Sequence, residues 1–115
     1  MAQWKEITTE NEWKEILERS NERLVLVMKH STRCPVSADA WKECQAYTAD
    51  SPSEEVDYIQ IKVIESRDVS NRIAEDLGVK HQSPQTILVK NREPVWNTSH
   101  WHIKKSALAE ALRTP

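Results

Sequence analysis

Cys34 is the residue in this sequence whose setting most favours chemistry. It follows the aliphatic run Leu24–Met28 and directly precedes Pro35, with Ser37 three positions beyond it. A cysteine in this setting can be a packing residue, a metal ligand, half of a disulfide or a nucleophile. Disulfide exchange needs the thiolate, and an unperturbed cysteine with a pKa of ~8.5 is only a few per cent ionised at neutral pH. The nucleophile interpretation therefore requires a local group that stabilises the anion.

A helix that starts at Cys34 or Pro35 supplies such a group. Proline suits the first turn of a helix, and the unpaired N–H groups of that turn present roughly half a positive charge to an anion. The Ser37 hydroxyl lies one turn from the sulfur, and Arg33 adds a neighbouring cation. These features predict a lowered pKa and a nucleophilic role for Cys34, with Pro35 and Ser37 as its catalytic partners.

The second cysteine of the chain, Cys44, does not complete a redox pair with Cys34. A CxxC pair would have its second thiol at position 37, where this chain has a serine. Ten residues along one helix correspond to about 15 Å of rise, beyond the ~7 Å limit between Cα atoms in a disulfide. The sequence predicts a monothiol mechanism, completed by an external thiol or reductase, and a packing role for Cys44. A redox role for Cys44 stays open.

Four histidines raise the alternative of a metal site. His100 and His102 share a face if they continue a strand, but no Cys-x-x-Cys accompanies them. Together with Cys34 they would form an incomplete zinc site, and we therefore expect no metal. His81 and Trp101 are candidates either for lining a pocket around the thiol or for solvated surface.

Length, charge and composition exclude several classes of protein. A chain of 115 residues with a net charge of -2 is predicted to form one domain over residues 1–115 and to lack the basic surface of a nucleic-acid binder. No apolar stretch approaches the ~20 residues of a membrane span, and the start of the chain is polar. We therefore expect a cytoplasmic protein with no nucleic-acid or membrane partner. The single glycine, Gly78, excludes glycine-rich phosphate loops.

The elements that position Cys34 alternate between strands and helices. Continuous apolar runs and period-two alternation predict strands at Gln3–Ile7, Leu24–Met28, Val56–Val63, Thr86–Val89 and Val95–Trp96. Apolar stripes at helical spacing predict helices that begin after Thr9 and at Cys34 or Pro35, a third that stops at Gly78, and a last one over Ile103–Leu112. The order βαβαβαββα predicts an α/β sandwich with a mixed central sheet that is largely parallel at its centre.

The chain resembles the thioredoxin superfamily over nearly its whole length. The resemblance rests on Cys-Pro-Val-Ser after the second strand and on the stretch Gly-Val-Lys-His-Gln-Ser-Pro-Gln-Thr-Ile-Leu-Val that starts at Gly78. Within the superfamily, CPVS, SPQT and Val95–Trp101 are most similar to the monothiol bacilliredoxins, the YtxJ-like proteins. Arg33 and Val36 depart from the threonine and isoleucine usual in that motif, and Arg33 places a charge beside the thiol.

This resemblance implies a thioredoxin-like three-layer sandwich with a cis peptide bond before Pro84, which leaves the backbone of Ser83 free to pair with a substrate. From the residues alone, Ser83–Pro84 is equally an ordinary strand start. The implied activity is removal of bacillithiol from proteins through a Cys34–bacillithiol mixed disulfide. The residues implied in substrate binding are Arg33, Ser83, Pro84, His81 and Trp101. No tightly bound cofactor is expected, because bacillithiol is a co-substrate.

The expected partners are S-bacillithiolated client proteins and a low-molecular-weight thiol or its reductase. Two other functions remain open: a non-catalytic thioredoxin-like binding or redox-sensing module, and a glutathione-dependent glutaredoxin. Bacillithiol carries the two carboxylates of malate, so a pocket that prefers it should be basic. The residues that make the sequence basic before the thiol and before the Ser-Pro pair are Lys29, His30, Arg33, Lys80 and His81.

Overall fold

Five strands form one mixed sheet in the computed structural model, which describes residues 4–50 and 55–113. The strands are β1 (Lys5–Glu6), β2 (Leu24–His30), β3 (Val56–Lys62), β4 (Gln85–Lys90) and β5 (Glu93–Ser99). Their order across the sheet is β1-β3-β2-β4-β5; β1, β3 and β2 run parallel, and β4 is antiparallel to both of its neighbours. The predicted mixed sheet is therefore confirmed, although its central strand β2 is parallel only to β3 and antiparallel to β4.

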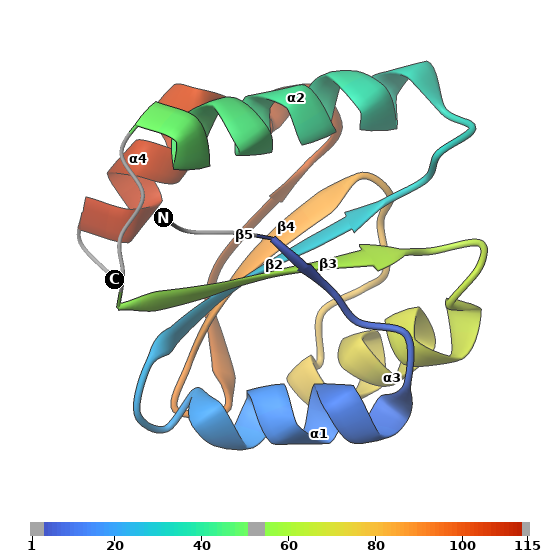
Figure 1. The fold of residues 1–115 in the computed structure, drawn as a ribbon, viewed down its shortest axis with the longest axis vertical. Coiled ribbons are helices and arrows are strands. Elements are labelled where there is room, and N and C mark those ends of the chain that lie inside the picture. The colour runs from blue at the N-terminus through green and yellow to red at the C-terminus, as the bar shows by residue number, and fades with distance from the viewer. Residues whose placement is uncertain (1–3, 51–54, 114–115) are drawn as a thin grey trace.

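Four α-helices and one short 3-10 helix complete the described part of the chain. They are α1 (Glu10–Arg19), α2 (Pro35–Asp50), α3 (Arg67–Leu77), η1 (His100–His102) and α4 (Lys105–Arg113). The pair α1 and α3 covers one face of the sheet, and the pair α2 and α4 covers the other (Figure 1). The element order and the three layers match the predicted sandwich.

Local sequence signals set the ends of the helices. The Thr9 side chain accepts the Glu12 N–H, and the Glu12 carboxylate accepts the Thr9 N–H, which together form a capping box at the start of α1. Gly78 follows α3 with a φ of 65°, the left-handed conformation that glycine adopts without strain. The helix boundaries predicted at Thr9, Pro35 and Gly78 are therefore confirmed.

The core lies on both faces of β2. Val25 and Val27 belong to the cluster under α1 and α3, whereas Leu26 and Met28 belong to the cluster under α2. All four side chains are fully buried. Because helices cover both faces of β2, residues that point to either face are apolar. This explains the continuous apolar run Leu24–Met28.

Several element boundaries differ from the sequence prediction, among them those of β2, β5 and β1. β2 extends past Met28 through Lys29 and His30, because both of these polar residues are buried in the sheet. β5 extends past Trp96 to Ser99. β1 comprises only Lys5–Glu6, and the predicted start of this strand at Gln3 lies outside the described residues.

His100 and His102 do not continue β5, so the condition under which they would share a face is not met. The chain leaves β5 at Ser99, and His100 adopts a φ of 52°, which no strand residue has. His100–His102 then form η1, so the two histidines do not share the face of a strand.

Candidate active site

Cys34 lies at the junction between β2 and α2. Residues 31–33 turn the chain after the strand, and α2 begins at Pro35. The Cys34 carbonyl accepts the Ala38 N–H at 3.0 Å, which makes Cys34 the N-cap residue of α2. Its side chain is partly exposed. The thiol therefore sits where the first N–H groups of the helix point.

The pKa of Cys34 is lowered, chiefly by the backbone N–H of Ser37 and next by that of Val36. Desolvation opposes the shift, and the Ser37 side chain adds to it. Hydrogen bonds of this kind favour the anion because they are stronger to a thiolate than to a thiol. The helix start thus increases the fraction of reactive thiolate at neutral pH.

Ser37 also holds the turn that leads to the thiol. Its side chain is fully buried, and its Oγ accepts the Ser31 N–H at 3.1 Å. The Ser31 Oγ in turn accepts the Arg33 N–H at 3.2 Å. These two bonds fasten the turn before Cys34 to the first turn of α2. The Arg33 residue itself is exposed beside the thiol.

Pro84 lies at the same end of the sheet as Cys34. β4 begins at Gln85, which pairs with Lys29, one residue before the end of β2. Pro84 therefore lies beside the end of β2 from which the chain continues to Cys34. The Ser83–Pro84 peptide bond is cis, as the resemblance predicted.

The loop before β4 also contacts η1. The Pro84 carbonyl accepts the His100 N–H at 3.0 Å, which fixes η1 beside this loop. Trp101, the middle residue of η1, is 62% exposed. The Ser83 Oγ is buried and has no hydrogen-bond partner among the described groups. The loop with Ser83 and Pro84 and the short helix with Trp101 therefore lie next to each other.

A pocket of 170 Å³ lies between α2 and η1. Its walls include Val36, which is two residues from Cys34, and the exposed Trp101. Asp39 and Lys104 contribute charges of opposite sign to the same walls. An aromatic surface next to charged groups suits a ligand that has both an apolar face and ionic groups.

The predicted basic pocket is only partly present. Lys29 is 0% exposed and His30 is 4% exposed, so neither presents its charge to a ligand at the surface. Both are strand residues packed under helices, which the sequence pattern did not indicate. Arg33, Lys80 and His81 are exposed. Of the five residues that make the sequence basic before the thiol and before the Ser-Pro pair, Lys29 and His30 are therefore buried and cannot serve an exposed basic pocket.

His30 belongs to an aromatic cluster on the α2 side of the sheet. Its ring stacks on Trp41 with the ring centroids 4.8 Å apart, and its Nε2 lies 2.8 Å from the Gln60 Oε1. Trp4 meets Trp41 edge-on at a centroid distance of 5.3 Å. Burial lowers the pKa of His30, although Gln60 opposes the shift. Trp41 is half-buried in this cluster.

His81 directs one ring nitrogen towards the interior. Its Nδ1 lies 3.3 Å from the Lys29 Nζ and 3.4 Å from the Ser70 Oγ. Burial lowers the pKa of His81, and the charges of Lys29 and Arg67 lower it further. The contact between His81 and Lys29 was not predicted from the sequence. Its only signal there is the position of Lys29 directly after the apolar run Leu24–Met28.

Cys44 is a packing residue. Its side chain is 0% exposed, and burial raises the pKa of its thiol to about 12. It belongs, with Leu26 and Met28, to the cluster under α2. A buried thiol with a raised pKa is a poor nucleophile, which confirms the predicted packing role.

His100 and His102, the candidate metal ligands, lie in η1. His100 has its Nδ1 3.1 Å from the Ser99 Oγ. Within residues 4–50 and 55–113, no three His, Cys, Asp or Glu side chains are grouped closely enough to hold a metal ion.

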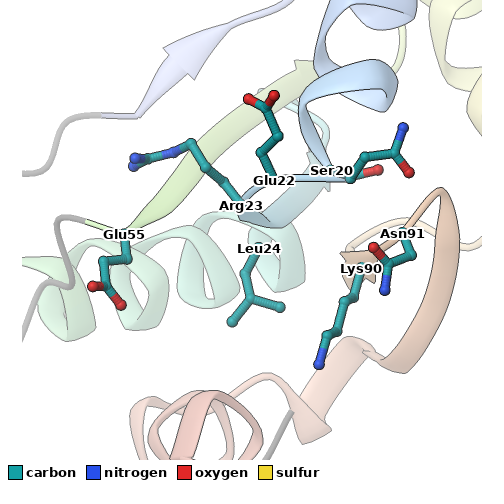
Figure 2. Close-up of a pocket in the computed structure, with 8 residues that line it drawn as sticks. Ser20, Glu22, Arg23, Leu24, Glu55, Lys90 and Asn91 are labelled. Atoms are coloured by element: carbon teal, nitrogen blue, oxygen red, sulfur yellow. The ribbon is translucent and has the colours of Figure 1, made fainter.

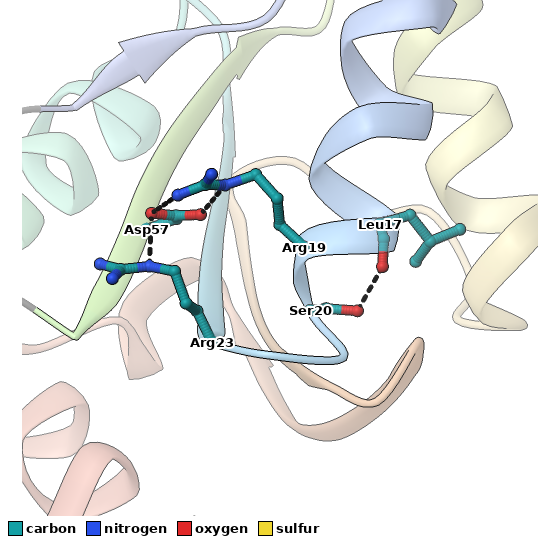
Figure 3. Close-up of polar contacts among 5 residues, drawn as sticks. All are labelled: Leu17, Arg19, Ser20, Arg23 and Asp57. Carbon is teal, nitrogen blue, oxygen red and sulfur yellow. Dashed lines mark hydrogen bonds and ion pairs between the residues drawn. The ribbon is translucent and has the colours of Figure 1, made fainter.

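A second pocket, of 420 Å³, lies at the opposite end of the sheet, between the α1–β2 connection and the end of β4 (Figure 2). Nearby, Asp57 of β3 accepts hydrogen bonds from Arg19 at 2.8 Å and from Arg23 at 3.0 Å, and the Ser20 hydroxyl donates to the Leu17 carbonyl (Figure 3). These contacts tie the end of α1 and the start of β2 to β3. Their role is structural, and they lie far from the thiol.

Comparisons with known proteins identify relatives over nearly the whole chain. A family model described as "Monothiol bacilliredoxin BrxC" matches residues 5–108. A solved structure described as "A putative oxidoreductase with a thioredoxin fold" is 32% identical, with a TM-score of 0.82 over 94% of this chain and 92% of that chain. Thioredoxin from Fasciola hepatica is 15% identical, with a TM-score of 0.75 over 95% of this chain and 96% of that chain. Thioredoxin from Nicotiana alata is 22% identical, also with a TM-score of 0.75, over 97% and 91%. At these identities the two thioredoxins show a common fold alone.

Proposed function

This chain belongs to the monothiol bacilliredoxin family, and on that premise we propose that it is a thiol-disulfide oxidoreductase that removes bacillithiol from S-bacillithiolated proteins through Cys34. One observation carries the proposal. The Cys34 thiol is partly exposed at the start of α2, and the N–H groups of Ser37 and Val36 lower its pKa. A lowered pKa and access from solvent are the two properties that a nucleophilic cysteine needs.

The first step is attack of the Cys34 thiolate on the bacillithiol sulfur of a client mixed disulfide. The disulfide bond to the client breaks, a new disulfide bond joins Cys34 to bacillithiol, and the client sulfur leaves as a thiolate. The numbers of thiolates and of disulfide bonds are unchanged. The N–H groups at the start of α2 stabilise the attacking anion before the substrate arrives, so this step needs no separate base.

The second step regenerates Cys34 with an external thiol. The position of a resolving cysteine is occupied by Ser37, and Cys44 is buried further along α2. A second bacillithiol thiolate, or an external reductase, attacks the Cys34–bacillithiol disulfide and releases the Cys34 thiolate. With bacillithiol as the attacking thiol, the product is bacillithiol disulfide. Bacillithiol is therefore a co-substrate rather than a bound cofactor.

The surroundings of Cys34 offer groups that could contact the parts of bacillithiol, in which a sugar joins the cysteine part to malate. The exposed Arg33 and the pocket residue Lys104 offer cations to the malate carboxylates. The exposed Trp101 offers an aromatic face to the sugar. We assign pairing with the main chain of the client to the Ser83–Pro84 segment. His81 instead has its Nδ1 next to the Nζ of Lys29.

We assign this reaction to the cytoplasm, with client proteins whose cysteines have been modified during oxidative stress. Low-molecular-weight thiols and their reductases keep cysteines reduced in that compartment, and they would also regenerate Cys34. No helix in the described ranges has the length and apolar character to cross a membrane.

The deciding experiment presents one target protein modified either with bacillithiol or with glutathione and follows release of the adduct by intact mass. We expect faster release of bacillithiol, loss of release in Cys34→Ser, and slower release at high salt, because screening weakens the attraction of an anionic adduct to Arg33 and Lys104. Equal or faster release of glutathione would overturn the assignment in favour of a glutaredoxin.

The alternative of a non-catalytic module is tested by alkylation of Cys34 across pH. Iodoacetamide reacts with the thiolate, so its rate reports the ionised fraction. Cys44→Ser leaves Cys34 as the one thiol and is the matched background. A midpoint clearly below the ordinary ~8.5 supports an enzyme, whereas a midpoint at or above ~8.5 supports the non-catalytic module.

A further inference from the structure

Lys29 is a buried lysine in the central strand β2, on the face of the sheet that α3 covers. Its side chain is 0% exposed. Its Nζ donates to the Ser70 carbonyl of α3 at 3.0 Å and lies 3.3 Å from the His81 Nδ1. The Ser70 Oγ lies 3.4 Å from the same ring nitrogen. We call these three residues the Lys29 cluster.

The Lys29 cluster holds a positive charge without a negative partner. Within the described part of the chain, the groups that contact the ammonium are a carbonyl and an imidazole, and no carboxylate pairs with it. Burying a charge in this way is strongly unfavourable, and here burial lowers the pKa of Lys29 to about 8. An apolar side chain would fill the same space without that cost. A costly polar group beside a candidate site points to a role in the reaction.

The cluster is connected to the loop of residues 80–84, which leads to the active-site end of β4. His81, in this loop, is held by the ammonium of Lys29. Gln85 pairs with Lys29 in the sheet, and its Nε2 donates to the Lys80 carbonyl at 3.0 Å. Lys29 and Gln85, which are neighbours on one face of the sheet, therefore both hold this loop through their side chains.

We propose that Lys29 is a positioning residue for disulfide exchange, because its buried ammonium holds His81, and with it the loop of residues 80–84, in place beside Cys34. The inference rests on the proposed function, since the position of this loop matters when Cys34 reacts with a client disulfide. Lys29 faces α3, whereas Cys34 begins α2 on the other side of the sheet. Lys29 therefore acts through the loop and leaves the ionisation of the Cys34 thiol unchanged.

The contact requires a neutral His81. Its Nδ1 accepts a hydrogen from the Lys29 ammonium only while that nitrogen carries no proton. A protonated ring would face the positive charges of Lys29 on β2 and Arg67 on α3, with only the neutral groups of Ser70 to receive its hydrogen. Burial and these two charges lower the pKa of His81, so only acidification to well below the ordinary histidine pKa of ~6.5 protonates the ring, breaks the contact and releases the loop.

The test compares Lys29→Met with Lys90→Met, which makes the same charge change at the other end of β4. We expect Lys29→Met to release bacillithiol from a client about tenfold more slowly than the wild type, the scale of one lost charge-assisted hydrogen bond. Its rate of alkylation by iodoacetamide should equal that of the wild type. Amide hydrogen exchange in the peptide that covers residues 80–85 should rise in Lys29→Met and not in Lys90→Met.

Two variants of His81 separate the hydrogen bond from the charge. His81→Leu removes the acceptor and should slow client exchange as Lys29→Met does. His81→Asn keeps an acceptor close to the position of Nδ1 without titrating. It should recover most of the client-exchange rate. In the wild type, the ratio of the client-exchange rate to the alkylation rate should fall at pH values well below about 6.5, and in His81→Asn this ratio should stay constant.

The outcomes distinguish this inference from the proposed function. A wild type that releases no bacillithiol refutes the proposed function. Amide exchange is measured without bacillithiol, so unchanged amide exchange in a folded Lys29→Met refutes the role of Lys29 independently. If Lys29→Met does not fold, His81→Leu decides the matter. Client exchange at the wild-type rate in His81→Leu would mean that Lys29 acts in the core alone, and it would overturn the inference.

Discussion

Replacing Lys29 with methionine removes the buried ammonium and is expected to make the protein more stable. Burial lowers the pKa of this lysine from 10.5 to about 8. This shift means that, at neutral pH, the charged lysine reduces the free energy of unfolding by about 3 kcal/mol. Loss of the hydrogen bond to the Ser70 carbonyl costs the variant about 1 kcal/mol of that gain. We therefore expect Lys29→Met to be about 2 kcal/mol more stable at pH 7.

The pH dependence of this difference follows from the direction of the shift. Between about pH 8 and pH 10.5, the unfolded chain keeps the proton on Lys29 and the folded protein releases it. The unfolded state binds more protons in this window, so the wild type gains stability as the pH rises through it, and the penalty is fully present below it. Methionine does not titrate. The advantage of the variant should therefore shrink by about 2 kcal/mol between pH 7 and about pH 10.

Urea unfolding of both proteins at the two pH values, with a reductant present, measures these free energies. Tyrosines, cysteines and other lysines that titrate in the same range are common to both proteins and cancel in the difference. Lys90→Met controls for the change in net charge. A folded Lys29→Met that is less stable than the wild type at pH 7, or an advantage that is the same at both pH values, would refute the reasoning.

Three further predictions concern the thiol and the far end of the sheet. Cys34→Ser should abolish the release of bacillithiol and Cys44→Ser should retain it, because burial raises the pKa of Cys44 to about 12; the intact mass of the client measures both. Ser37→Cys should place a second thiol one turn from Cys34 and form an internal disulfide, seen as the loss of two hydrogens after mild oxidation, and no such loss would contradict the position of the helix start. Burial alone would raise the pKa of Asp57, but the two arginines that it binds lower it overall. Asp57→Asn should therefore reduce the free energy of unfolding by about 1 kcal/mol at pH 7 and by progressively less below about pH 4, as urea unfolding will show.

Cys34 could be placed from the sequence because independent local signals coincide there. A buried run ends shortly before it, Pro35 favours a first helical turn, and the apolar stripe that includes Cys44 continues beyond it. The cis bond before Pro84 is predictable only from the resemblance, since ~5–6% of X–Pro bonds in folded proteins are cis. Local pattern thus placed Cys34 at the start of a helix, and the family motif indicated the cis bond before β4.

Lys29 could not be predicted in the same way. Lysine is almost never fully buried, so the pattern ends the second strand at Met28. Its burial depends on partners 41 and 52 positions away, the Ser70 carbonyl and the His81 ring. Hydrophobic periodicity compares residues within one element and contains no information about such partners. The missed residue is therefore one whose environment is created by tertiary contacts alone.

The Cys34 thiolate and the Lys29 ammonium have opposite environments. A single variant, Lys29→Met, can therefore change one of these charges without changing the other. The Cys34 thiolate is partly exposed and depends on N–H groups of α2, so its ionisation should survive changes elsewhere in the sheet. The Lys29 ammonium is buried without a counter-charge, so its presence lowers stability while it holds the loop before β4. Selection for stability alone would favour an apolar residue there. A Lys29→Met protein that is more stable, equally reactive towards iodoacetamide and slower with a client would show that the lysine serves exchange, because neither unfolding nor a less ionised thiol could then explain the slower rate.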